Sequence, residues 1–492
     1  MKKHKGLVLA LFGSVLFSCS YNECEISEFL DQKEREYEEI CIQKGTEVWQ
    51  YYTDSAHSVN SLSTDRFMQF FYDDTLKEKI NNWYKIRGKV RNDTLRRRIV
   101  IWNDIITCAQ VNFESEVINH QSYLENILAD YPSDQYTDQY IENEIVKLIK
   151  LRNQKARESG YGNYAHMVLQ NTGIDTLWFE NLVSFIDSST SESYKEFVRK
   201  ISLTGVSPGY SDIMGYVVKT YELRDLYQGM KFDKKRQMDK ILNHIGIDIN
   251  TSPIQYTFSS LPPGIGGFGN AISIPDDFKA VAREELSFYY LLHEIGHGLQ
   301  WTGVEIEQPV LKGYEWCMGN SACLYNEAMA EVIATFSSSY KYLEEFGYTP
   351  QKIDSITDTI LELRPLFLRY QIVNALFEIE LYRNPEKPAE LIKQELYRKY
   401  LFVEKDFSKK SNLISLSYVS YPVYEQNYLI ADIVSTQIHG YLKRVYGDDY
   451  FLNPAVGTFL KASLWKSGEL RDWRQRILQA TNMDLYDNSF YE

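Results

Sequence analysis

The chain has 492 residues, 44% hydrophobic side chains and a formal net charge of −14, so it can bury a large core and is acidic overall. This charge argues against a nucleic-acid partner, which requires clustered positive charge, and against adhesion to an anionic membrane through protein charge alone. With only 13 prolines and no Ser/Gly-rich or single-sign tract, no linker is evident, and we expect one large domain over residues 19–492.

The first residues have the pattern of an export signal. Met1–Lys5 is basic, residues 6–17 are apolar, and Cys19 comes directly after a small residue. The apolar run is too short to cross a bilayer, which predicts a cleaved signal peptide over residues 1–18. The arrangement resembles a bacterial lipobox, which implies lipidation of Cys19 and anchoring in the bacterial cell envelope, facing away from the cytoplasm. The alternative is an ordinary secretory signal with an incidental cysteine.

The next part of the chain has helical periodicity. From Ile26 to about Leu128, Tyr, Trp, Ile and Leu recur at spacings of three and four between charged residues, which predicts several amphipathic helices. Further helices are predicted over residues 138–160, 178–201 and 233–245. Residues 19–250 are therefore expected to form a mostly helical half.

Residues 253–275 interrupt this pattern. Gln255–Phe258 and Asn270–Ile274 have the composition of short strands, which predicts a small sheet before the next helix. Such a strand could pair with an extended peptide, or the sheet could be purely structural. Gly264–Gly269 formally matches the G-x-G-x-x-G nucleotide loop. It neither follows a convincing strand nor opens a helix, so we expect a flexible flap instead.

Residues 291–299 read Leu-Leu-His-Glu-Ile-Gly-His-Gly-Leu and contain an HExxH motif. Two histidines four apart on a helix lie on one face, so His293 and His297 can converge on a single metal ion. Glu294 is rotated off that pair, where it can meet a metal-bound water. The surrounding run is apolar, and a buried helix would not carry these polar groups inward without a partner for them.

A second helical segment, Tyr325–Phe336, places Glu327 and Glu331 four residues apart on one face. A catalytic zinc takes three protein ligands and keeps one open position, so Glu327 is the natural third ligand. Glu331 suits the acceptor for the outer N–H of a ligand histidine. The alternative is that both glutamates belong to a solvated helix face.

One zinc ion held in this way has a defined chemistry. Zinc lowers the pKa of its water, Glu294 takes the proton, and the hydroxide attacks a carbonyl that the same ion polarises. Glu294 then passes the proton to the leaving amine. The oxyanion needs a further donor, for which Tyr424 and Tyr428 are candidates at helical spacing.

The zinc motifs, His293–His297 and then Asn326–Glu331, resemble those of the gluzincin peptidases of the angiotensin-converting-enzyme and thimet-oligopeptidase type. Tyr424 and Tyr428 fall where these families place two tyrosines that contact substrate and stabilise the oxyanion. Other stretches that agree are Ala156-Arg157, Gly160–Tyr164, Gly468, Asp472-Trp473 and Thr481. The resemblance extends from about residue 150 to the end of the chain.

The resemblance implies both a fold and a function. The fold would be mainly α, with two helical halves flanking a deep active-site cleft and a small β-sheet next to the zinc helix. The halves would be about residues 19–250 and the zinc-containing residues 251–492. The function would be that of a zinc metallopeptidase, of the oligopeptidase or peptidyl-dipeptidase kind, acting on short peptides.

Two departures from these families bear on activity. Tyr418 stands where both families carry a histidine shortly before the tyrosine pair, and no nearby lysine matches the one that grips a substrate carboxylate. A catalytically weak zinc- or peptide-binding relative is therefore one alternative. Another is a structural lipoprotein with a fortuitous HExxH.

The cysteines suggest two disulfides in an oxidising compartment. Cys317 and Cys323 lie in the stretch between His297 and Glu327, which is longer than in the converting-enzyme family, and a bridge there would tighten the added loop. Cys24–Cys41 is the second candidate pair.

Overall fold

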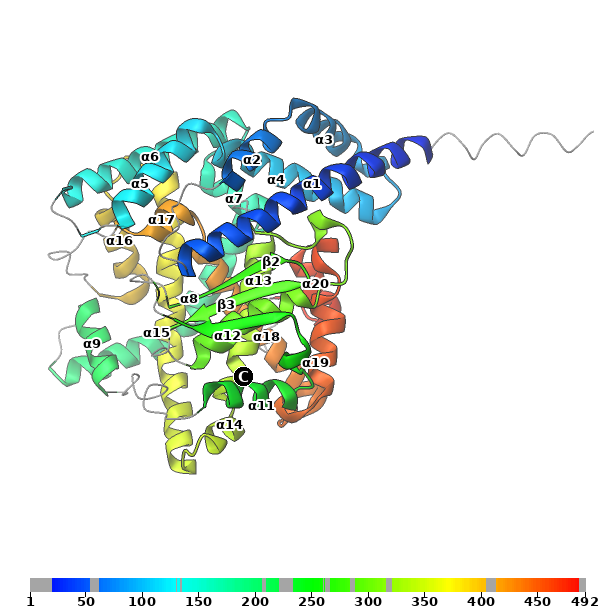
Figure 1. The fold of residues 1–492 in the computed structure, drawn as a ribbon. Coiled ribbons are helices and arrows are strands. Elements are labelled where there is room, and N and C mark those ends of the chain that lie inside the picture. Colours follow the sequence, from blue (N-terminus) through cyan, green and yellow to red (C-terminus); the bar gives the residue numbers. More distant parts are fainter. Residues whose placement is uncertain are drawn as a thin grey trace, which may run out of the picture.

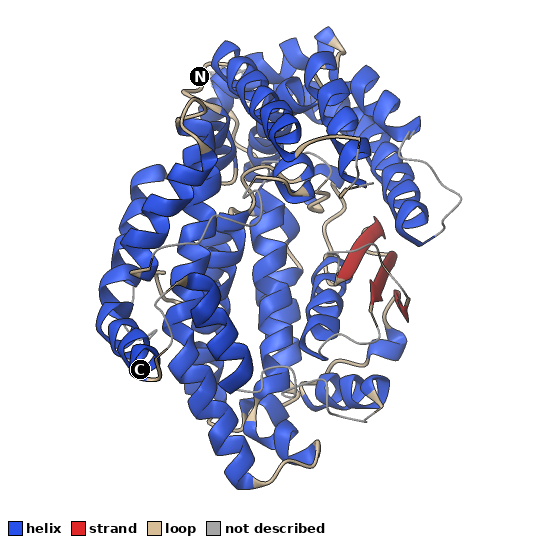
Figure 2. Cartoon of the chain, turned by 90° about the vertical axis from the view of Figure 1, so that its left-hand side faces the viewer, coloured by secondary structure: helices blue, strands red, loops and turns tan. Residues whose placement is uncertain are grey.

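The computed structural model describes residues 20–53, 62–129, 131–132, 135–205, 209–220, 233–259, 261, 266–283, 288–315, 321–403 and 413–485. The predicted signal peptide, Cys19, Cys317 and the first part of the expected flap, Gly264 included, lie outside these residues. Within the described chain, helices predominate and the strands form one small sheet on one side of the molecule (Figure 2).

The part of the chain before the sheet is helical, as predicted. Its helices are α1 (Ser20–Thr53), α2 (Leu62–Phe71), α3 (Asp74–Ile86), α4 (Asp93–Asn112), α5 (Ser115–Ala129), α6 (Asp138–Glu158), α7 (Tyr164–Asn171), α8 (Thr176–Leu203), α9 (Tyr210–Thr220) and α11 (Lys234–His244). Side-chain oxygens of Thr137, Asp175 and Asp233 cap the starts of α6, α8 and α11 by accepting backbone N–H groups. The three individually predicted helices are therefore confirmed to within a few residues.

The sheet has three strands, β1 (Ile254–Phe258), β2 (Gly267–Ser273) and β3 (Asp277–Ala282), in the order β1-β3-β2. β1 runs parallel to β3, and β2 runs antiparallel to it. The central strand, β3, was not predicted, whereas both edge strands were. The expected flap is wrong for Gly267 and Gly269, because both residues belong to β2.

The remaining helices follow the sheet. They are α12 (Phe288–Thr302), α13 (Ser321–Thr335), α14 (Tyr340–Glu345), α15 (Pro350–Arg383), α16 (Ala389–Leu396), α17 (Leu416–Ser420), α18 (Glu425–Tyr446), α19 (Ala455–Phe459) and α20 (Trp473–Thr481). The sheet packs on α12, α12 on α13, α13 on α18, and α18 on α15, the long helix drawn in yellow (Figure 1). The mainly α architecture with a small sheet beside the motif helix is confirmed.

Two glycines in and beside the HExxH motif let α12 lie close to both of its neighbours. A Cβ added at Gly296 would lie 2.7 Å from the Cα of Ala330 on α13. A Cβ added at Gly298 would lie 2.5 Å from Cδ1 of Phe278 on β3. Because neither glycine carries a side chain, α12 is held tightly between α13 and the sheet.

Helix α1 lies against part of the outer edge of β2, and the two are joined by a side-chain contact. The Asn270 side-chain Nδ2 donates to the carbonyl of Gly45 over 2.6 Å. A Cβ added at Gly45 would lie only 2.9 Å from the carbonyl oxygen of Ala271. Helix α1 and the sheet therefore share a contact surface at this end of β2.

One buried apolar cluster extends through the described chain from Ile26 to Leu485. It includes residues of the N-terminal helices, the sheet and the helices around α12. None of the described helices combines the length and apolarity that crossing a bilayer requires.

Both predicted disulfides are wrong in this structure. Cys24 and Cys41 are free thiols on the same helix, α1. A helix rises about 1.5 Å per residue, so their Cα atoms are about 25 Å apart, far beyond disulfide reach. Cys323 is also a free thiol, buried on α13 one turn before Glu327. Its predicted partner, Cys317, lies outside the described residues.

Candidate metal centre

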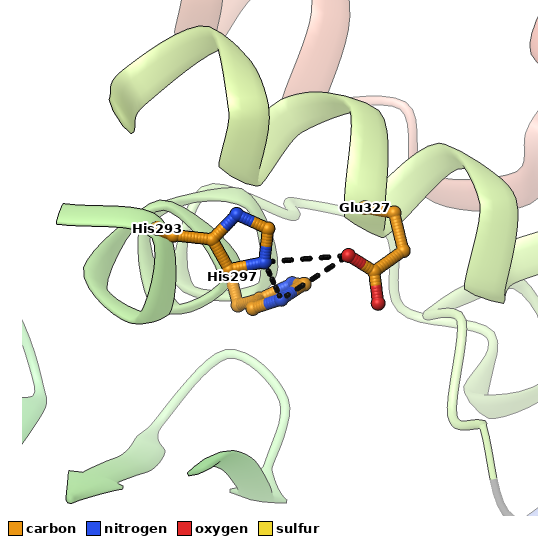
Figure 3. A group of neighbouring side chains, drawn as sticks. All are labelled: His293, His297 and Glu327. Atoms are coloured by element: carbon orange, nitrogen blue, oxygen red, sulfur yellow. Dashed lines mark hydrogen bonds and ion pairs between the residues drawn. The ribbon is translucent and has the colours of Figure 1, made fainter. Parts of the chain in front are cut away.

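The two histidines of the motif converge as their spacing predicts. His293 and His297 lie one turn apart on α12, and their Nε2 atoms are 3.1 Å from each other. Their rings are nearly perpendicular, with an interplanar angle of 87°. Both Nε2 atoms face the same point beside the helix (Figure 3).

Glu327 reaches this point from the facing helix, α13. Its Oε2 lies 3.3 Å from Nε2 of His293 and 3.8 Å from Nε2 of His297. Tetrahedral zinc with bonds of about 2.0–2.1 Å to nitrogen and oxygen would separate its ligand atoms by about 3.3 Å. The three side chains in Figure 3 therefore have the spacing that one such ion requires.

The burial of these groups also fits a cation. Oε2 of Glu327 is buried and has no hydrogen-bond partner among the described residues. Burial alone would raise the pKa of Glu327, but its contact with His293 and its electrostatic interactions with both histidines hold that pKa below its usual value. Burial alone would lower the pKa of His293, but Glu327 and Glu331 raise it well above the ordinary value. The carboxylates thus stabilise positive charge at this position.

The pKa of His297 is shifted in the opposite direction to that of His293. Burial lowers the pKa of His297 to about 4, so its imidazole is neutral at physiological pH. A neutral imidazole is the form that binds a metal ion. His2Glu is a donor set found in catalytic zinc sites.

Each histidine is also held through its outer nitrogen. Nδ1 of His293 lies 3.1 Å from Oε1 of Glu331, the residue predicted for this contact. Tyr289, one turn before His293, donates its hydroxyl to the other oxygen of Glu331. Such contacts fix the ring orientation and the tautomer of a metal-binding histidine.

The corresponding partner of His297 is Asn326, whose side-chain oxygen contacts Nδ1 of the ring. The amide group of Asn326 in turn donates to Oε1 of Gln300 over 2.7 Å. Sequence reasoning assigned no role to Asn326, Gln300 or Tyr289. The available signals were weak: Asn326 precedes the predicted ligand, and Tyr289 lies four residues before His293.

Glu294 lies off the histidine pair and against the sheet. A Cβ added at Gly267 would lie 2.9 Å from Oε1 of Glu294, and one added at Gly269 would lie 2.9 Å from Oε2. The two glycines of β2 therefore leave the space that the carboxyl group occupies. Burial raises the pKa of Glu294 to about 7, which suits a group that takes up and releases a proton near neutral pH.

The two predicted tyrosines have neighbouring rings but make different contacts. Tyr424 donates its hydroxyl to Oε1 of Glu327 over 2.8 Å. The ring of Tyr428 lies 5.4 Å from that of Tyr424, and 37% of the residue's surface is exposed. Burial, followed by the charge of Glu327, raises the pKa of each phenol well above its ordinary value, so both carry their protons at neutral pH.

Tyr418 occupies the position of the expected histidine and packs on another helix. Its ring meets that of Phe377 on α15 edge-on, with a centroid distance of 5.6 Å. Burial raises the pKa of its hydroxyl well above the usual value.

The looser motif residues form internal packing. Trp473 on α20 is buried and donates its Nε1–H to the carbonyl of Thr172. Tyr164 is buried on α7, where its backbone N–H donates to Oδ1 of Asn153. These contacts join α20 and α6 to the region around α7.

No protein-family model and no curated protein matches the chain. Solved structures with similar folds include a Pyrococcus furiosus carboxypeptidase, at TM-score 0.66 and 16% identity, covering 95% of this chain and 97% of that one. An M32 carboxypeptidase from Deinococcus radiodurans R1 has TM-score 0.63 and 12% identity, with the same coverage. An oligoendopeptidase F-type protein from Bacillus anthracis str. Ames has TM-score 0.54 and 12% identity, covering 98% and 96%. At these identities the comparison shows a shared fold.

Proposed function

We propose that this chain is a zinc-dependent metallopeptidase that hydrolyses peptide bonds in short peptides. The observation that carries the proposal is the convergence of potential ligand atoms of His293, His297 and Glu327 within 4.8 Å of one another. Glu294 directly follows His293 on the same helix. The naming of the structural neighbours as carboxypeptidases and an oligoendopeptidase supports the same class.

In this proposal, His293, His297 and Glu327 hold the ion, which when bound supplies Lewis-acid activation of water and of the substrate carbonyl. Glu294 accepts the proton from the attacking water and later donates it to the leaving amine. Tyr428 donates its hydroxyl to the developing oxyanion. The hydroxyl of Tyr424 donates a hydrogen bond to Glu327, so its main contribution is to orient that carboxylate.

The outer edge of β2 is where we propose that the peptide binds. The N–H of Arg283 donates to the carbonyl of Gly266, so these two residues form a hydrogen-bonded pair at the end of the β2–β3 ladder. Because bonding alternates along an antiparallel strand, the backbone groups of Gly267 and Gly269 face the outer edge. An extended peptide paired there would lie beside Glu294, because a Cβ added at either glycine would lie 2.9 Å from a carboxyl oxygen of Glu294.

The main alternative is a catalytically weak relative that binds zinc or peptides. Tyr418 favours it, because a tyrosine packed on Phe377 replaces the histidine of the families that the sequence resembles. A peptide-library digest read by mass spectrometry, with and without a chelator, tests the choice. Chelator-sensitive cleavage supports the peptidase, and the cut positions separate endopeptidase from exopeptidase action. Intact peptides with zinc bound would favour the weak relative.

We also propose that Cys19 carries a lipid that anchors the protein in the bacterial cell envelope. Only the sequence supports this localisation. Cell fractionation of the full-length chain and of its Cys19→Ala variant tests it. The lipidated wild-type chain should sediment with membranes, and the variant should be released into the soluble fraction.

A further inference from the structure

The turn that leads into α18 has a strained backbone. Val423 has a φ of 58°, in the left-handed region that a β-branched residue rarely adopts. Such a conformation persists only where surrounding contacts hold it. Tyr424 follows directly, so whatever holds this turn also sets the position of the Tyr424 side chain.

Glu378, a residue of α15, forms hydrogen bonds to the backbone of this turn. It is buried, with 2% of its surface exposed, and its Oε2 accepts the backbone N–H of Tyr424 over 2.7 Å and that of Glu425 over 2.9 Å. These N–H groups lie at the start of α18, where the first turn of a helix lacks internal partners. Sequence reasoning gave Glu378 no role.

The same turn is connected to the metal centre. Tyr424 donates its hydroxyl to Oε1 of Glu327, and the other oxygen of Glu327 faces Nε2 of His293. A displaced Tyr424 would let the Glu327 carboxylate rotate. Glu378, the Tyr424 backbone, the Tyr424 hydroxyl and Glu327 thus form a continuous series of contacts from α15 through α18 to α13.

We propose that Glu378 is a positioning residue for the metal centre, which fixes Tyr424 so that its hydroxyl holds Glu327 in the orientation that binds zinc. This inference rests on the proposed function for its metal, and it adds a residue that touches neither the ion nor the peptide. A purely structural role would instead affect stability alone.

The test is a double-mutant cycle on zinc affinity, measured by competition with a chelator on metal-free protein. Glu378→Ala and Tyr424→Phe should each weaken zinc binding about tenfold. The double variant should be no weaker than either single one, because both changes break one series of contacts. Glu378→Gln keeps an acceptor oxygen and should restore nearly full affinity.

Glu34 offers a matched control, because it is a buried glutamate that accepts hydrogen bonds from Arg98 and Trp102. Glu34→Ala should lower the melting temperature and leave zinc affinity unchanged. If Glu378→Ala does not fold, Glu378→Asp, one methylene too short for both N–H groups, takes its place in the cycle.

Two results would overturn the inference: zinc affinity unaffected by the Glu378 change, or losses that multiply in the double variant. Failure of the proposed function looks different. A chain that binds zinc but cleaves no peptide would refute the peptidase, while the affinity cycle would still decide the role of Glu378.

Discussion

Glu331 and His293 are in contact across two helices, with Oε1 of the carboxylate 3.1 Å from Nδ1 of the imidazole. The opposite nitrogen of the same ring faces Glu327. His293 is therefore held on both sides by carboxylates from α13, four residues apart. Such an arrangement fixes the orientation of the ring and, in the proposed metal site, would increase its basicity as a ligand.

Replacing Glu331 should therefore weaken the metal site without removing it. We expect Glu331→Gln to lower zinc affinity about 10- to 100-fold, because the ring loses its charged acceptor. Chelator competition on the purified variant measures this. Glu344 on α14, half-exposed and paired with Lys341, supplies the control, and Glu344→Gln should bind zinc normally. Equal affinity for the two variants would contradict the assigned role of Glu331.

The glycines of β2 should matter for turnover more than for metal binding. A Cβ at residue 269 would lie 2.8 Å from Cζ of Phe278 and 2.9 Å from Oε2 of Glu294. We expect Gly269→Ala to displace the Glu294 carboxyl and lower kcat by about tenfold to a hundredfold, with zinc content unchanged. At Gly440 an added Cβ meets nothing within 4 Å, so Gly440→Ala should keep full activity. Wild-type kcat in Gly269→Ala would show that this contact does not position Glu294.

Glu378 should make stability depend on pH. Burial raises its pKa to about 8, against an ordinary value of 4.5, and backbone N–H groups at the start of α18 offset only part of this rise. Between these two pH values the unfolded chain releases the proton and the folded chain keeps it. Stability should therefore fall as pH rises from 4.5 to 8, by at most about 1.4 kcal/mol per pH unit from this group.

Melting temperatures of the wild type and Glu378→Gln across this pH range isolate the effect, because all other groups are shared. The glutamine variant cannot ionise, so its melting temperature should fall less steeply with pH. Parallel curves for the two proteins would mean that Glu378 is ionised in the folded state at neutral pH.

The sequence predicted those parts of the site that depend on helical spacing. His293 and His297 are four residues apart, as are Glu327 and Glu331, and helix geometry alone places each pair on one face. The sequence did not predict the contact between α12 and α13, because this contact depends on the close packing of Gly296 against Ala330 in the tertiary structure.

Other features had no local signal. β3 was missed because its sequence, Asp-Phe-Lys-Ala-Val-Ala, holds small and charged residues and follows a turn. Glu378 is remote in sequence from Tyr424, and only the packing of α15 on α18 brings them together. The predicted Cys24–Cys41 disulfide is wrong because both cysteines lie on one uninterrupted helix, which keeps their thiols apart.

The central claim is that Glu294 works as the proton-transferring group at a zinc ion held by His293, His297 and Glu327. The most direct test is the turnover of fluorogenic peptides by wild type and Glu294→Gln, with zinc content determined on the same samples. We predict one zinc per chain in both proteins and a loss of turnover of at least about a hundredfold in the variant. Undiminished turnover in zinc-loaded Glu294→Gln would contradict this claim.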